Sequence, residues 1–275
     1  MFGEVIVPID GSELAAHALE VGAVIAGVNH ADLRVLAYTR GDDKPPLFLS
    51  VSDQVAEIAR RFGIEPTLTM EPLERFVAGQ VLAEAKARPG SLICMASHGR
   101  GRTAAYFGSV ASEVLNLSAG PVVICGPQYV PGRFQLEQKG PIIVALDGTD
   151  ESEKILPIAE AWSVVFDLPL EIVTVLPVET ANELASAVAS GDIVESGYVG
   201  TMASAAGELT ARLADFEVLH DEHPAHAIVV EAKARNATLV AMATHAPTGL
   251  ERLRRGSITA EVIRHATAPV LALRP

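Results

Sequence analysis

Tandem repetition of one sequence pattern constrains the fold of this chain more than any other feature. The segment Glu4–Ser12, EVIVPIDGS, recurs as Pro141–Thr149, PIIVALDGT. The segment Glu84–Arg88, EAKAR, recurs unchanged as Glu231–Arg235. Matches that keep their order along the whole chain are the signature of a duplicated unit, so we predict two copies of one domain.

The length of the chain agrees with a duplication. A chain of 275 residues is long for one domain and sufficient for two, each with its own core. The stretch Pro127–Gly140, PQYVPGRFQLEQKG, is rich in turn formers and flexible side chains, which is typical of a linker. We therefore predict a first domain over 1–127, a linker over 128–140 and a second domain over 141–275.

Each copy alternates short β-branched runs with longer segments of helical periodicity. In the first copy we expect strands at Val5–Val7, Leu33–Tyr38, Thr67–Met70, Leu92–Met95 and Val122–Cys125, and helices at Glu13–Ala26, Val51–Phe62, Phe76–Ala87 and Ser109–Leu117. This alternation predicts an α/β fold with right-handed crossovers, an open parallel sheet and helices on both of its faces. Ligands of such sheets bind beyond the carboxyl ends of the strands.

Composition excludes several classes of protein. The net charge of −13 argues against a nucleic-acid partner, although local groups could still hold a small nucleotide. No apolar run approaches the roughly 20 residues that a membrane helix needs, and no signal-peptide pattern opens the chain. We therefore expect a cytoplasmic protein without a membrane partner. Cys94 and Cys125 lie in apolar segments and are expected to be buried, reduced thiols.

An aspartate ends the first predicted strand of each copy. Asp10 and Asp147 are each followed by glycine and then by a hydroxyl residue, Ser12 or Thr149. The aspartate could cap the following helix, which spacing alone favours, or could bind a ligand such as a ribose hydroxyl. The two roles could also be divided, with Ser12 or Thr149 as the cap and the aspartate facing the ligand.

A glycine-containing loop follows the fourth predicted strand of the first copy. Residues 97–101, SHGRG, can turn sharply and present backbone N–H groups. Gly108 and Ser109 then stand at a helix start, where unpaired N–H donors and the helix dipole favour an anion. Ser109 could add a hydroxyl donor, and Arg100 or Arg102 could reach phosphate oxygens.

Histidines could supply general-base catalysis or a metal site, but simpler roles are favoured for both groups. His98 and His245 could act as general bases, but neither sits in a nucleophile motif with a carboxylate to orient it, so a loop or packing role is favoured. His220, His223 and His226 straddle a proline that marks a helix start, so we expect a solvated loop there and no metal site. We assign no catalytic residue.

Taken together, both strand-Asp-Gly-Ser/Thr openings, both Met-Ala-x-His segments and both Gly-Ser helix starts resemble the universal stress protein family in its tandem two-domain form. The resemblance covers nearly the whole chain. It implies a five-stranded parallel sheet of order 3-2-1-4-5 in each copy. It also implies ATP, AMP or cyclic AMP as ligand, with Mg²⁺ only as a counter-ion of the nucleotide. Family members commonly pair through their last strands, so the two copies are expected to form such a pseudo-dimer within one chain, with a further homodimer left open.

The resemblance also implies where a nucleotide would bind. The candidate residues of the first copy are Ile9, Asp10, Ser12, Tyr38, Met95, Ala96, Ser97, His98, Gly99, Arg100, Gly108, Ser109 and Val110. Those of the second copy are Leu146, Asp147, Thr149, Val175, Met242, Ala243, Thr244, His245, Ala246, Gly256, Ser257 and Ile258.

Both copies depart from the family motif, which is glycine, two residues, glycine, nine residues and then Gly-Ser or Gly-Thr. The first copy has Ala96 at the first glycine, keeps Gly99 and is one residue short before Gly108. The second copy keeps the spacing but has Ala243 and Ala246 at both early glycines. We expect the first copy to be the better nucleotide site, because backbone access is harder to replace than one loop residue.

Three functions compete at this point. The first is a stress-linked regulatory protein that binds an adenine nucleotide in at least one copy and is at most a slow ATPase. The second is an interaction scaffold without a nucleotide. The third is an adenylylating or pyrophosphatase-type enzyme, which ranks last because its signature loops are missing from the sequence.

Overall fold

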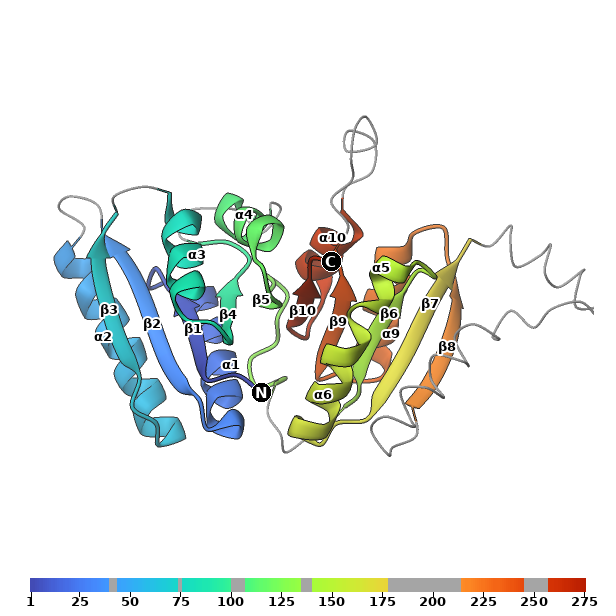
Figure 1. Ribbon diagram of the computed structural model, residues 1–275, viewed down its shortest axis with the longest axis horizontal. Coiled ribbons are helices and arrows are strands. Elements are labelled where there is room, and N and C mark those ends of the chain that lie inside the picture. The colour runs from blue at the N-terminus through green and yellow to red at the C-terminus, as the bar shows by residue number, and fades with distance from the viewer. Residues whose placement is uncertain (40–43, 74–75, 100–106, 135–139, 178–213, 245–256) are drawn as a thin grey trace, which may run out of the picture.

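The ten strands of the described chain form one continuous sheet (Figure 1). The computed structural model describes residues 1–39, 44–73, 76–99, 107–134, 140–177, 214–244 and 257–275. The strand order is β3-β2-β1-β4-β5-β10-β9-β6-β7-β8. Each half therefore has the order 3-2-1-4-5, and the α/β class and tandem architecture predicted from the sequence are confirmed.

The first half follows the predicted elements closely. It consists of β1 (Glu4–Pro8), α1 (Glu13–Asn29), β2 (Asp32–Thr39), α2 (Lys44–Phe62), β3 (Thr67–Pro72), α3 (Val77–Ala87), β4 (Ser91–Ala96), α4 (Ser109–Leu117) and β5 (Val122–Cys125). Helix α2 begins seven residues before the predicted start at Val51. Its two prolines fall in the first turn, where a helix tolerates the loss of the amide hydrogen.

The described part of the second half repeats this order, except that two helices follow its first strand and that residues 178–213, between β7 and β8, lie outside the described residues. It consists of β6 (Ile142–Leu146), α5 (Asp150–Glu153), α6 (Leu156–Phe166), β7 (Leu170–Leu176), β8 (Ala214–His220), α9 (Pro224–Ala234), β9 (Leu239–Ala243), α10 (Ile258–His265) and β10 (Val270–Leu273). Two helices, α5 and α6, stand where the first half has the single helix α1. Pro157 near the start of α6 has no amide hydrogen to continue a helix from α5.

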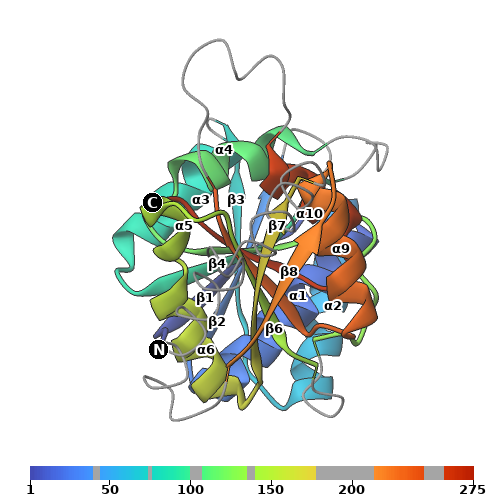
Figure 2. The same cartoon turned by 90° about the vertical axis from the view of Figure 1, so that its right-hand side faces the viewer.

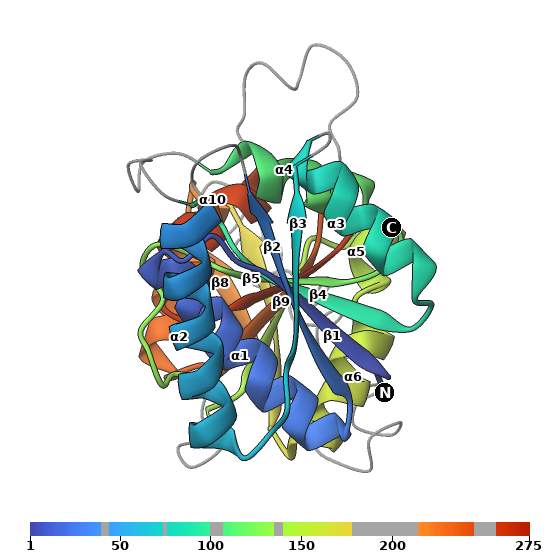
Figure 3. The same cartoon turned by 90° about the vertical axis from the view of Figure 1, so that its left-hand side faces the viewer.

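The two halves join through their last strands. Strand β10 pairs with β5 antiparallel, with Leu271 opposite Val123, whereas the strands within each half pair parallel. The intramolecular pairing implied by the family resemblance is thus present. Figures 2 and 3 view the sheet from its two ends and show its strong twist, with helices on both sides.

Each face of this sheet carries a hydrophobic cluster that runs through both halves. One cluster includes Val5 of the first half and Trp162 of the second, and the other includes Ile93 and Val262. Pairing of β5 with β10 makes the buried faces of the two halves continuous. Cys94 and Cys125 are buried free thiols, as predicted.

The described part of the segment between the halves is packed against both of them. Tyr129 is buried, and its ring lies 5.8 Å from that of His17 on α1. Phe134 is buried at 5.6 Å from Phe166 and 6.4 Å from Trp162, measured between ring centroids. This segment consequently fixes one half against the other.

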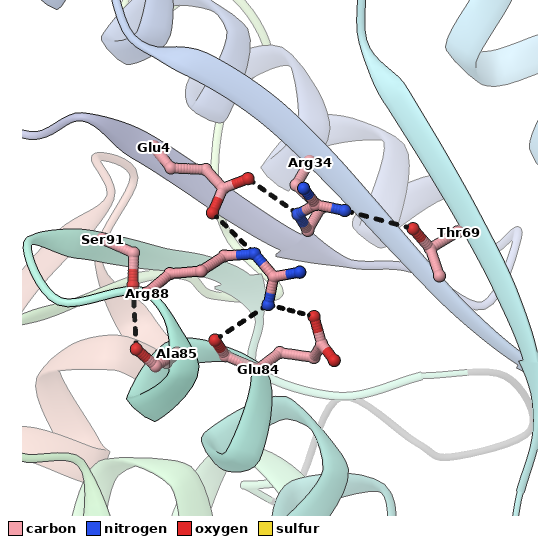
Figure 4. Close-up of polar contacts among 7 residues, drawn as sticks. All are labelled: Glu4, Arg34, Thr69, Glu84, Ala85, Arg88 and Ser91. Carbon is pink, nitrogen blue, oxygen red and sulfur yellow. Dashed lines mark hydrogen bonds and ion pairs between the residues drawn. The ribbon is translucent and has the colours of Figure 1, made fainter.

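The repeated EAKAR motif anchors the helix that follows the third strand of each half. In the first half the Glu4 carboxylate accepts from Arg34 Nε at 2.7 Å and pairs with Arg88 Nε at 3.1 Å, and Arg88 also pairs with Glu84 (Figure 4). Arg34 donates in addition to Thr69 Oγ1. The end of α3 is thereby tied to β1, at the edge of the sheet opposite the strand carboxyl ends.

The second half uses a different set of charges at the same place. Arg235 contacts Glu231 at 2.6 Å, Glu171 at 3.2 Å and Glu217 at 3.6 Å. Glu171 is buried, and burial raises its pKa, although Arg235 lowers it.

None of the described helices is long and apolar enough to cross a membrane.

Candidate functional site

A cleft of about 490 Å³ opens at the carboxyl edge of β1, β2 and β4 in the first half. Its lining includes all but one of the described candidate residues of the first copy: Ile9, Asp10, Tyr38, Met95, Ala96, Ser97, His98, Gly99, Gly108, Ser109 and Val110. Ser12 is not part of the lining, and Arg100 lies outside the described residues. The structure therefore brings together side chains from sequence segments that are far apart.

The cleft has an apolar part that sequence reasoning missed. Leu47 of α2, Leu73 after β3 and Val77 of α3 line it, together with Pro8, Ala15 and Ala111. These residues belong to runs that also fill the core, so their sequence carries no separate signal of a site. Only the positions of Leu73 and Val77, at a strand end and the next helix start, point to the correct edge of the sheet.

Asp10 and Ser12 divide the two roles that the sequence left open. Ser12 Oγ accepts from Ala15 N at 3.3 Å and caps α1, while Asp10 Oδ1 accepts from Ser12 N at 3.0 Å. Gly11 makes this turn possible with a φ of 76°. The capping role is thus filled by Ser12, and the Asp10 carboxylate lies in the cleft.

Glycine is required where the loop after β4 passes Asp10. A Cβ on Gly99 would lie 2.3 Å from Asp10 Oδ2, well inside van der Waals contact. A side chain at position 99 would thus displace the carboxylate. Gly99 therefore keeps Asp10 in its place in the cleft.

The start of α4 forms the polar end of the cleft. Gly108 is the N-cap of this helix and, being a glycine, has no side chain with which to cap it. Gly108 N donates to Ser97 O at 2.8 Å, and a Cβ on Gly108 would lie 2.5 Å from that oxygen. An uncapped helix start that faces a cleft favours an anionic group.

His98 lies between these two polar features. Its Nδ1 is 3.1 Å from Ser97 Oγ, and Ser97 is buried. The imidazole is half-buried and lines the cleft. Its orientation is therefore set by a neighbouring hydroxyl and not by a carboxylate.

Among the described residues that line the cleft, Tyr38 contributes an aromatic ring. Its hydroxyl is buried, and no hydrogen-bond partner for it exists in the part of the chain that the structure describes. Burial, with smaller contributions from Glu84 and Glu71, raises the pKa of this phenol well above its usual range. The hydroxyl consequently stays neutral.

The corresponding residues of the second half are arranged differently. Asp147 is exposed, and its Oδ1 accepts from Thr149 N at 3.1 Å and from Thr149 Oγ1 at 2.6 Å. Thr149 Oγ1 in turn accepts from Ser152 N and caps α5. This aspartate is thus held by its own turn.

The other candidates of the second copy fall into two groups. Ser257 caps α10 by accepting from Ala260 N at 3.4 Å, whereas α4 begins one residue earlier and has Gly108 as its N-cap residue. The remaining described candidates lie at the ends of β6, β7 and β9 or at the start of α10: Leu146, Val175, Met242, Ala243, Thr244 and Ile258. The predictions for His245, Ala246 and Gly256 lie outside the described residues.

Two of the three histidines near residue 220, His223 and His226, contact Asp221 just before and at the start of α9. Asp221 Oδ1 accepts from His223 N at 2.7 Å, and its Oδ2 is 2.8 Å from His226 Nδ1. These hydrogen bonds lower the pKa of Asp221, and the bond from His226 makes the largest contribution. Over the described ranges, no group of three or more His, Cys, Asp or Glu side chains could hold a metal ion.

Comparisons with known proteins agree with this fold. The model of the universal stress protein family matches residues 1–126 and 140–274. The crystal structure of a universal stress protein from Archaeoglobus fulgidus DSM 4304 is similar at 19% identity and a TM-score of 0.68, over 99% of this chain and 98% of that one. A functionally unknown protein from Pseudomonas aeruginosa PAO1 is similar at 17% identity and a TM-score of 0.68, over 100% of this chain and 93% of that one.

A shorter structure, of a universal stress protein in complex with cAMP, matches 50% of this chain and 98% of its own at 17% identity and a TM-score of 0.37. The comparison with curated proteins gives no match.

Proposed function

This chain belongs to the universal stress protein family, and we propose that it is a stress-response regulatory protein that binds an adenine nucleotide in the cleft of its first half. The observation that carries this proposal is the cleft itself. It combines an apolar part, a carboxylate and an uncapped helix start at the carboxyl edge of a parallel sheet. A nucleotide needs these three surroundings for its base, its ribose and its phosphate.

The apolar part suits a purine base. Tyr38, Leu73 and Val77 offer an aromatic ring and aliphatic side chains on the side of β2 and α3. A volume of about 490 Å³ lies within the range of roughly 300–1,000 Å³ that is usual for small-molecule sites. The cleft therefore has room for a nucleoside with phosphate.

The polar part suits ribose and phosphate. The Asp10 carboxylate can accept from a ribose hydroxyl, and the first N–H groups of α4 can donate to phosphate oxygens. Ligands of the ATP or AMP class fit this arrangement, and cyclic AMP shares the same base, ribose and phosphate. Mg²⁺ would enter only with the phosphates. We assign no catalytic residue, so turnover of ATP is expected to be slow at most.

The second half is the weaker candidate. Asp147 already accepts two hydrogen bonds from Thr149, and Ser257 caps the helix that would face a phosphate. A ligand there would have to replace these hydrogen bonds, whereas the N-cap residue of α4, Gly108, has no side chain.

Calorimetric titration with ATP, AMP and cyclic AMP tests the proposal. We expect Asp10→Ala to lower the affinity for the nucleotide about 20-fold, because a charge-assisted hydrogen bond contributes about 1.5–3 kcal/mol. The matched variant Asp147→Ala should change affinity less than about 2-fold. A well-folded protein that binds none of the three ligands would refute nucleotide binding and favour a scaffold function. Equal losses from the two variants would refute the preference for the first half.

A further inference from the structure

Two side chains of helix α2 hold the backbone of the turn that carries Asp10. Ser50 Oγ and Gln54 Nε2 each donate to the carbonyl oxygen of Gly11 at 3.2 Å, and Gln54 Nε2 also lies 3.4 Å from the carbonyl oxygen of Ser12. Carbonyl oxygens only accept, so the amide nitrogen of Gln54 and not its amide oxygen faces them. The two lone pairs of the Gly11 carbonyl are thus both used by α2.

The Gly11 carbonyl belongs to the same peptide unit as Ser12 N, which donates to Asp10 Oδ1 at 3.0 Å. A trans peptide is planar, so its C=O and its N–H point in opposite directions. Because α2 holds the oxygen, the N–H is aimed at the Asp10 carboxylate. Gly11, with a φ of 76° and no Cβ, offers little resistance to rotation of this peptide, so its orientation depends on the hydrogen bonds at its two ends.

We propose that Gln54 and Ser50 are positioning residues for the ligand, which hold the Asp10 carboxylate where it accepts from a ribose hydroxyl. This inference rests on the proposed function of the cleft and assigns α2 a part in controlling it. Neither side chain is among the described residues that line the cleft, so each acts through the Gly11–Ser12 peptide and not by touching the ligand.

Helix α2 is anchored in a way that suits this role. It packs beside α1 (Figure 3), and its residues Leu47, Val51 and Ile58 are buried in the cluster that includes Val5. The two donors are four residues apart and therefore lie one turn apart on the same side of the helix. Since Leu47 also lines the cleft, α2 fixes an apolar wall of the cleft relative to the carboxylate.

A pair of ligands isolates the contact that Asp10 makes. AMP carries both free ribose hydroxyls, whereas its dideoxy analogue lacks them and keeps the base and the phosphate. We expect calorimetry to show about 20-fold higher affinity of the unchanged protein for AMP than for dideoxy-AMP.

Two variants remove the donors of α2. Gln54→Met keeps the length of the side chain and should lower the affinity for AMP about 5-fold, and the milder Ser50→Ala should lower it about 3-fold. Neither variant should change the affinity for dideoxy-AMP, because that ligand has no hydroxyl for Asp10 to accept from. Binding of dideoxy-AMP also shows that each variant retains a folded cleft.

Matched controls make the same substitutions away from the turn. Gln80 of α3 also donates its amide to a backbone carbonyl, that of Pro72, at 3.3 Å, so Gln80→Met loses a similar bond. Ser52→Ala lies two residues beyond Ser50, on the opposite side of α2. We expect neither control to alter the ratio of the affinities for AMP and dideoxy-AMP.

A double-mutant cycle tests whether the effect passes through Asp10. In the background of Asp10→Ala, Gln54→Met should lower the affinity for AMP by less than about 2-fold, because the carboxylate that it positions is gone.

Other outcomes would overturn the inference. Equal losses of both ligands in Gln54→Met, the full loss of AMP affinity in the Asp10→Ala background, no loss in either α2 variant, or equal affinity of the unchanged protein for the two ligands would each do so while leaving nucleotide binding intact. Failure of the unchanged protein to bind either ligand would instead refute the proposed function, and this inference with it.

Discussion

The two halves of this protein share a scaffold and differ at the strand ends. Asp10 lies in a cleft beside Gly99, whereas Asp147 is exposed and bonded to Thr149. At the position of Gly99 the second copy has Ala246. After the duplication, sheet order and core were retained in both halves, while the residues that could hold a ligand diverged.

The opposite edge of the sheet shows the same contrast in its charges. In the first half one carboxylate, that of Glu4, is shared by Arg34 and Arg88. The second half replaces Glu4 by Pro141 and Arg34 by Glu171, so that Arg235 faces three carboxylates. When Glu84 is counted with Glu4, anchoring of the helix end thus tolerates a change from two arginines and two carboxylates to one arginine and three carboxylates, and the arginine of the EAKAR motif is present in both.

The largest difference in the effect of equivalent substitutions on folding stability is expected at two equivalent glycines, one before β1 and one before β6. A Cβ on Gly140 would lie 1.9 Å from Asn236 O, a backbone atom, whereas a Cβ on Gly3 would meet nothing within 4 Å. Gly140→Ala should lower the free energy of unfolding by about 3 kcal/mol, because backbone must move to make room. Gly3→Ala should change it by less than about 0.5 kcal/mol. Urea unfolding followed by circular dichroism measures both, and a similar small effect for both would show that the Gly140 segment is not held against Asn236.

The next largest difference in the loss of folding stability is expected between substitutions of the two EAKAR arginines, Arg235 and Arg88. Arg235→Gln should destabilise by about 2 kcal/mol, because it leaves the buried Glu171 without its cation. Arg88→Gln should cost about 1 kcal/mol, because Glu4 keeps Arg34.

The pH dependence of Arg235→Gln supplies its check. The pKa of Glu171 is already raised in the folded protein, and loss of the cation raises it further. A raised carboxyl pKa destabilises the fold at pH values above it, so the deficit of Arg235→Gln should shrink as the pH falls from neutral toward that pKa. A deficit that grows on acidification would contradict this explanation.

Gly99→Ala would give the first half the residue type that the second half has at the equivalent position, Ala246. The added Cβ would displace the Asp10 carboxylate, which is the end of a side chain and not part of the backbone, so folding should be affected by less than about 1 kcal/mol. Affinity for the nucleotide should fall about 10-fold, because the carboxylate leaves its place. Calorimetry and unfolding of the same preparation separate the two effects, and unchanged affinity would show that Gly99 does not position Asp10 for the ligand.

The smallest effect is expected at Tyr38, where the second copy has Val175. Tyr38→Phe removes a buried hydroxyl that has no partner among the described residues and should raise the free energy of unfolding by about 1 kcal/mol. The control Tyr129→Phe removes a hydroxyl that bonds to the backbone of Phe134 and should lower it by a similar amount. Changes of the same sign in both variants would show that the Tyr38 hydroxyl is satisfied in solution.

Periodicity and repetition predicted the fold well, because both report the buried faces of regular elements. Strand β5 and helix α4 have the residues expected from the sequence. The start of α2 and the split of α5 from α6 were missed, because proline at a helix start and proline that ends a helix look alike in a single sequence. The core that continues through β5 and β10 depends on pairing between distant segments, which no local pattern encodes.

The candidate site was predictable in its polar residues and in the apolar Ile9, Met95 and Val110, but not in the apolar residues that α2, α3 and the end of β3 contribute. Asp10, Gly99 and Gly108 follow from turn and helix-start chemistry, which is local. Leu47 and Leu73 come to the cleft only through the packing of α2 and β3 on the sheet. The difference between Asp10 and Asp147 was likewise hidden, since it depends on side-chain hydrogen bonds that the shared Asp-Gly-Ser/Thr pattern permits in both halves.

Trp162, the only tryptophan of the chain, gives the molecule an intrinsic optical reporter. It is fully buried, with Phe166 of its own half, Phe134 of the connecting segment and Phe2 of the first half around it. Its emission therefore senses the place where all three parts of the chain meet. A shift of that emission at lower denaturant than the loss of helix would mean that the halves separate before either one unfolds.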